Sequence, residues 1–114
     1  MQIVDDDFFQ AVKPTLHPGT VLISATQFAE GSSLVKVVLS VILKDGKWTL
    51  PMYVMFLGST GTDGQPVWAI SPWFTDNAIN CLATLIPPSL LFGRLSPEDS
   101  ERLKAQARAW WAAA

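Results

Sequence analysis

Two apolar runs, residues 34–43 and 48–57, stand on either side of a short charged break, Lys-Asp-Gly-Lys. Each run is about half as long as the roughly twenty apolar residues that a membrane-spanning helix needs, and Lys36 interrupts the first run. The Asp45-Gly46 pair inside the break favours a hairpin turn, because glycine adopts the positive φ that tight turns require. The pattern therefore predicts a β-hairpin rather than a membrane segment.

The two runs also predict which residues face each other across the hairpin. When Val41 lies opposite Leu50 and Val37 opposite Val54, one face is apolar throughout. A slip by one residue would mix this face with polar positions of the first run, so burial should fix the register. The predicted pairs on this face are Leu43–Trp48, Val41–Leu50, Leu39–Met52, Val37–Val54 and Val35–Phe56.

Pro51 conflicts with the simplest form of this hairpin. With a two-residue turn, Pro51 would face Ser40 at a position where the strands exchange hydrogen bonds, and proline has no N–H to donate. A four-residue loop over 44–47 keeps the register and avoids the conflict, whereas a bulge at Pro51 is the other solution. We expect the longer loop.

Capping residues mark the starts of two helices. Asp5 or Asp6 is suited to cap a short first helix, and if Asp5 is the cap, Val4 and Phe9 fall at the positions of a hydrophobic staple. Ser96, followed by Pro97 and early acidic residues, predicts the start of the last helix. Its apolar stripe would consist of Leu103, Ala107, Trp110, Trp111 and Ala114.

The remaining elements follow from composition and spacing. Residues 20–28 and 66–71 are typical of strands, 74–86 carries an apolar stripe at helical spacing, and 89–95 is interpreted as a connector. Short loops between successive strands favour antiparallel pairing. The sequence thus predicts one α+β domain over 1–114: a short N-terminal helix, a four-stranded antiparallel β-meander and two C-terminal helices packed on the sheet.

Charge narrows the range of functions. Hydrophobic residues make up 49% of the chain and charged residues 16%, below the roughly 25% usual for soluble domains. The net charge is −2 and the basic residues are dispersed, which argues against a nucleic-acid partner. The start, MQIVDDDFF, lacks the features of a signal peptide, so we expect a cytoplasmic protein without a membrane partner.

Candidate chemistry is sparse. A single cysteine, Cys81, excludes an intramolecular disulfide, and with a single histidine, His17, it makes no zinc site. His17 is typical of a turn, Cys81 of a small core residue, and Asp5-Asp6-Asp7 of a helix start. The glycine-rich stretch 58–65 lacks a phosphate-binding pattern. We find no enzyme signature, and we expect no catalytic residue, cofactor or metal.

The second face of the predicted hairpin suggests an interaction surface. It would carry Ile42–Thr49, Ser40–Pro51, Val38–Tyr53, Lys36–Met55 and Leu34–Leu57, a mixture too apolar for a solvated face. It could be covered by the N-terminal segment of the same chain, by a second copy or by another protein. The interface residues that we predict are Val38, Ile42, Tyr53, Met55 and Trp68.

These observations predict a non-catalytic protein-interaction protein that forms a homodimer. By size and character it would suit a phage or mobile-element accessory protein, acting as an inhibitor or adaptor on a host protein. The alternative is a small domain that binds an apolar ligand in a pocket between sheet and helices.

Overall fold

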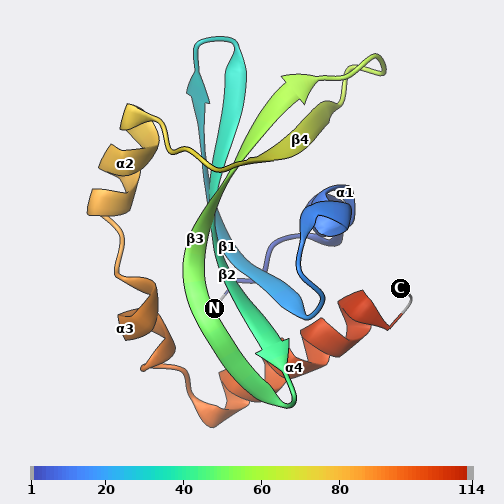
Figure 1. Ribbon diagram of the computed structural model, residues 1–114, viewed down its shortest axis with the longest axis vertical. Helices are drawn as coiled ribbons and strands as arrows, with labels where there is room; N and C mark the ends of the chain where they lie inside the picture. The colour runs from blue at the N-terminus through green and yellow to red at the C-terminus, as the bar shows by residue number, and fades with distance from the viewer. Residues whose placement is uncertain (1, 113–114) are drawn as a thin grey trace.

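The computed structural model describes residues 2–112 and has the predicted α+β architecture (Figure 1). A short helix precedes a four-stranded antiparallel sheet of order β1-β2-β3-β4, and helices that pack on the sheet follow it. The elements are α1 (Asp6–Val12), a 3-10 turn (Lys13–Thr15), β1 (Thr20–Glu30), β2 (Ser33–Lys44), β3 (Lys47–Thr60), β4 (Pro66–Ser71), α2 (Asp76–Ala83), α3 (Pro88–Phe92) and α4 (Pro97–Trp111).

The C-terminal part contains one more helix than the sequence predicts. The short α3 lies within the segment interpreted as a connector and begins at Pro88, where the missing N–H of proline costs nothing. The preceding helix α2 is shorter than predicted and is capped by the Thr75 side chain. Helix α4 begins as predicted, with the Ser96 side chain accepting a hydrogen bond from the backbone N–H of Asp99. Ala114, the last residue of the predicted stripe, lies outside the described residues.

Helix α1 owes its position to its acidic start. Of the two predicted candidates, Asp5 is the N-cap, and its Oδ1 accepts a hydrogen bond of 2.8 Å from the N–H of Phe8. Asp6 Oδ1 accepts a second bond of 2.8 Å from Trp110 Nε1 on α4. The acidic run therefore caps one helix and ties it to another.

The observed hairpin turn is shorter than the predicted one. Lys44 pairs with Lys47, so the loop holds only Asp45 and Gly46, not the four residues expected. Both loop residues have positive φ, 52° and 75°, as a type I′ turn requires. Next to this turn the predicted pair Leu43–Trp48 is confirmed.

Further from the turn the predicted register is wrong, because Pro51 is accommodated by a bulge. The pairing shifts between Ile42 and Ser40, where β3 contains one residue more than β2, and Leu50 takes a positive φ of 42°. The proline that cannot donate to the ladder thus lies in the irregular stretch. Beyond it Val37 lies opposite Met55, not Val54. The predicted partners on β3 are displaced in the same way for Leu39 and Val35, whereas Val41 lies in the irregular stretch and is not paired with Leu50.

The bulge redistributes side chains between the two faces of the sheet. Residues directly opposite in an antiparallel pair share a face. Val38 now shares a face with Val54, and Val37 shares the other with Met55. A second irregularity between Leu22 and Ser24 of β1 adds to the distortion of the sheet.

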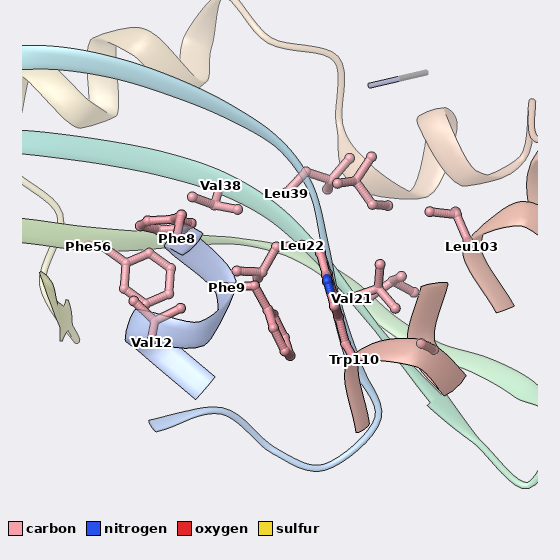
Figure 2. Packing of buried hydrophobic residues seen from close by; sticks show 13 residues of the cluster. Phe8, Phe9, Val12, Val21, Leu22, Val38, Leu39, Phe56, Leu103 and Trp110 are labelled. Carbon is pink, nitrogen blue, oxygen red and sulfur yellow. The ribbon is translucent and has the colours of Figure 1, made fainter. Parts of the chain in front are cut away.

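The main core lies where α1 and α4 meet the sheet (Figure 2). The rings of Phe9 and Trp110 stack with centroids 4.0 Å apart, and Trp111 Nε1 donates to the backbone oxygen of Thr20 at the outer edge of β1. Helix α4 thereby covers part of that edge. The buried members are Phe8, Phe9, Val12, Val21, Leu22, Ile23, Val38, Leu39, Val41, Phe56, Leu103, Ala107 and Trp110.

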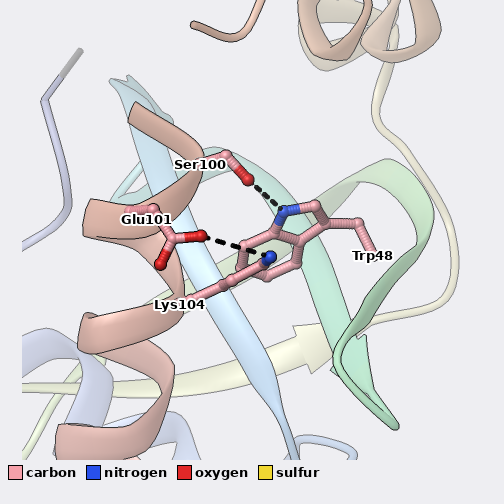
Figure 3. A network of polar contacts seen from close by, with 4 residues as sticks. All are labelled: Trp48, Ser100, Glu101 and Lys104. Carbon is pink, nitrogen blue, oxygen red and sulfur yellow. Dashed lines mark hydrogen bonds and ion pairs between the residues drawn. The ribbon is translucent and has the colours of Figure 1, made fainter. Parts of the chain in front are cut away.

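A polar contact fixes the hairpin end to α4 (Figure 3). Trp48 Nε1 donates to Ser100 Oγ at 3.1 Å, so the indole lies along the first turn of the helix. Beside it Lys104 and Glu101 form an ion pair of 3.5 Å on the helix surface. This exposed ion pair lies within α4 and contributes little to stability. The hydrogen bond of Trp48 is therefore the contact that joins the hairpin to the helix.

Candidate functional site

Two of the five predicted interface residues are buried inside the chain. Val38 is 0% exposed and belongs to the main core, whereas Met55 is 1% exposed and belongs to a second core with Val35, Val37 and Ala78. The bulge at Pro51 separates them onto different faces of the sheet. The row of interface residues predicted from the hairpin therefore does not form.

The other three predicted residues are partly buried. Tyr53 packs between the two cores, and its hydroxyl donates to the backbone oxygen of Ile86 at 3.0 Å. Burial raises the pKa of the Tyr53 phenol above its ordinary value of 10.0, and the nearby Cys81 adds to the increase. Trp68 packs its ring edge-on against Phe8 at 5.5 Å. Ile42 pairs with Thr20 and Thr49 near the turn.

Apolar side chains are exposed mainly in one region of the chain. Among the described residues, every large hydrophobic side chain that is exposed lies between residues 50 and 90, which we call the apolar segment. Trp73 is the extreme case, with 80% of its surface accessible. The full set is Leu50, Met52, Leu57, Val67, Ile70, Trp73, Ile79, Ile86 and Leu90.

The same region is almost free of charge. No lysine, arginine or glutamate occurs between Lys47 and Arg94, and Asp63 and Asp76 are its only acidic residues. This composition can be read from the sequence alone, and it is the signal that points to the exposed surface. Of the predicted interface residues, Tyr53, Met55 and Trp68 lie in this region, and all three are buried or partly buried.

Helices α2 and α3 and the connections beside them carry four of these side chains, Trp73, Ile79, Ile86 and Leu90. Within α2 only Ala78 is buried, and within α3 no residue is. Both helices follow β4 in the chain (Figure 1); α2 contacts β2, and α3 contacts β3. They therefore leave Ile79 and Leu90 accessible to solvent while α2 covers the second core.

A second candidate site is the amine of Lys36 together with the aromatic rings around it. Its Nζ lies 4.0 Å from the centroid of the Phe8 ring and 4.8 Å from that of Trp68. Such positions over aromatic faces are those of cation–π contacts. Burial lowers the pKa of this amine below its ordinary value of 10.5, and the carboxylate of Asp5 acts in the opposite direction. Within residues 2–112 the amine has no hydrogen-bond acceptor and no ion-pair partner.

Two cavities open beside this amine. One, of about 290 Å³, lies between the N-terminal segment and the sheet and includes Asp5, Ser24 and Lys36 in its lining. The other, of about 470 Å³, lies between α1 and the sheet and includes Asp7 and Trp68 together with Lys36. Lys36 therefore lines both cavities.

The other candidates for chemistry stay apart. His17 lies in the turn before β1, and its Nδ1 is 2.8 Å from the backbone oxygen of Pro18. Cys81 is a partly buried thiol on α2. In the part of the chain that the structure describes, neither side chain forms a hydrogen bond with another ionisable side chain.

No protein-family model, no curated protein and no solved structure matches the chain. The helices within residues 2–112 are all too short or too polar to cross a membrane.

Proposed function

We propose that this is a non-catalytic interaction protein that self-associates through the apolar segment. The observation that carries the proposal is that the exposed large hydrophobic residues of the described chain all lie between residues 50 and 90. Monomeric proteins seldom leave extended apolar patches uncovered. A partner that covers this region would remove apolar area from water, which is the main favourable term in protein association.

A second copy suits the charge of this region. With Asp63 and Asp76 as its only charged residues, the segment offers no basic group to an acidic partner and few acidic groups to a basic one. Its own copy brings the same apolar side chains and little like-charge repulsion. A twofold contact needs only one self-complementary patch, so no additional surface is required.

Trp73 is the residue on which we expect the contact to depend most. Tryptophan is enriched at the energetic centres of interfaces because it buries a large apolar area. Trp73 packs little within its own chain, since 80% of it is exposed. Its replacement should therefore change association without unfolding the monomer.

Sedimentation velocity over a range of concentrations tests the proposal. The unmodified protein should dimerise, and Trp73→Glu and Ile79→Glu should each shift it to monomer with an unchanged circular dichroism spectrum. Ala105→Glu is the matched control, because it adds the same charge at an exposed position of α4, and it should leave association intact. A monomer at millimolar concentration, or equal effects of all three variants, would overturn self-association.

One observation favours a second function, the binding of a small apolar ligand. A cavity of about 340 Å³ lies between the sheet and the α3–α4 segment, with Ile23, Leu39 and Phe92 among its walls. Arg94 and Asp99 also line it, an apolar site with few polar groups of the kind that binds small molecules. Native mass spectrometry of the purified protein should then show a co-purifying species that is lost with Leu39→Trp, a substitution that fills the cavity.

A further inference from the structure

The amine of Lys36 combines three properties that no other lysine of the described chain shows together. Its Nζ lies over two aromatic rings, those of Phe8 and Trp68. It has no hydrogen-bond acceptor or ion-pair partner within residues 2–112. It also lines two cavities large enough to admit a small molecule. A nitrogen with its hydrogen-bonding capacity unused and space in front of it is accessible to a ligand.

The charges around the cavities narrow the class of ligand. An anion would be attracted by Lys36 but repelled by Asp5 and Asp7, whose side chains line the same cavities. A cation would be attracted by these carboxylates but repelled by the amine that lines both cavities. A neutral molecule that reacts with an amine meets neither obstacle, and the rings of Phe8 and Trp68 favour one with an apolar or aromatic body.

We propose that Lys36 is a site at which a small neutral aldehyde binds covalently as an imine. The neutral amine nitrogen attacks the carbonyl carbon, and its lone pair forms the new carbon–nitrogen bond. The resulting carbinolamine loses its hydroxyl group and the nitrogen-bound proton as one molecule of water. The product is a carbon–nitrogen double bond to Lys36, and no oxidant or reductant takes part.

The surroundings favour both the reaction and its product. Burial lowers the pKa of the Lys36 amine below its ordinary value, so a larger fraction of this amine is neutral and nucleophilic than of an ordinary lysine amine in water. The imine is protonated to a cation more weakly hydrated than ammonium. The ring faces at 4.0 and 4.8 Å can hold that cation as they hold the amine.

Reductive trapping with benzaldehyde tests the proposal on the full chain. The protein is incubated with benzaldehyde and cyanoborohydride at pH 7, and the benzylated lysines are quantified by peptide mass spectrometry. Lys36 should be modified severalfold faster than Lys44 and Lys47. Even modification of all lysines, or slower modification of Lys36 than of the hairpin lysines, would overturn the proposal.

Three variants test whether the rapid labelling of Lys36 depends on the surrounding rings or only on its accessibility to solvent. Lys36→Arg keeps a cation between the rings and should abolish the rapid phase while the circular dichroism spectrum is unchanged. Trp68→Leu removes one ring and should slow labelling of Lys36 severalfold, whereas Lys44→Arg, the matched control, should leave it unchanged. Labelling of Lys36 that is indifferent to Trp68→Leu would contradict the role of the rings. Because Lys36 and Lys44 lie outside the apolar segment, the outcomes of Lys36→Arg and Lys44→Arg are independent of self-association. Trp68 lies within that segment, so Trp68→Leu is compared with the unmodified protein in dilute solution, where both are monomeric.

Discussion

The part of the molecule around α1 and α4 buries its large apolar side chains, whereas the apolar segment between residues 50 and 90 exposes many of its own. In the first part, Phe9 and Trp110 stack, and Trp111 of α4 covers part of the outer edge of β1. In the second, α2 buries a single alanine and α3 buries nothing. The first arrangement stabilises the chain by itself. The second leaves apolar area exposed to solvent.

The difference has a local cause in the helices. Helix α4 spans 15 residues and buries Leu103, Ala107 and Trp110 on one stripe. Helices α2 and α3 span 8 and 5 residues, lengths at which helices in water depend on packing for their stability. With little packing from their own chain, α2 and α3 should open locally more often than α4.

The largest expected effect comes from the same truncation placed in each region. Leu103→Ala in α4 should reduce the free energy of unfolding by about 2–5 kcal/mol, because the side chain is fully buried. Leu82→Ala in α2, where the leucine is only partly buried, should cost less than about 2 kcal/mol. Urea denaturation of both variants checks the comparison. Equal losses would mean that the two regions are equally well packed.

A smaller effect is expected at the bulge that divides the hairpin. Leu50 is 70% exposed and has a φ of 42°, a conformation that costs a side-chain-bearing residue about 1–2 kcal/mol. Leu50→Gly should therefore stabilise the protein by about 1 kcal/mol in urea denaturation. Met52→Gly, at a neighbouring exposed position without positive φ, should destabilise it. Destabilisation by both would contradict the bulge.

The smallest effect concerns Tyr53, which connects the two cores. Its pKa is raised in the folded state, so above pH 10.0 the unfolded chain loses this proton first. The stability that Tyr53 contributes is thus fully present below pH 10.0 and is lost as the pH rises through the folded pKa. Because Tyr53 is the only tyrosine, phenolate absorbance reports on it alone. A titration midpoint at or below that of the urea-unfolded chain would contradict its burial.

Local signals in the sequence predicted the elements well. The caps at Asp5 and Ser96 mark the starts of α1 and α4 because each supplies an oxygen to a free backbone N–H. Asp45-Gly46 marks the turn for an equally local reason. The α+β class follows from such signals, since each depends on neighbours in the chain.

Properties that depend on distant residues were not predicted. Pro51 signalled a conflict, but whether the turn or the strand would absorb it depended on the whole ladder, and the wrong choice moved Met55 to the opposite face. The position of Lys36 between Phe8 and Trp68 joins three elements and leaves no local pattern. The self-associating state and the role as an inhibitor of phage or mobile-element origin stay predictions.

Hydrogen exchange at two protein concentrations tests the central claim most directly. In dilute solution, the amides of α2 and α3 should exchange faster than those of α4, because their helices bury little within the chain. At high concentration, exchange in α2 and α3 should slow while exchange in α4 stays the same, since a second copy covers only the apolar segment. Exchange rates in α2 and α3 that do not change with concentration would contradict the account.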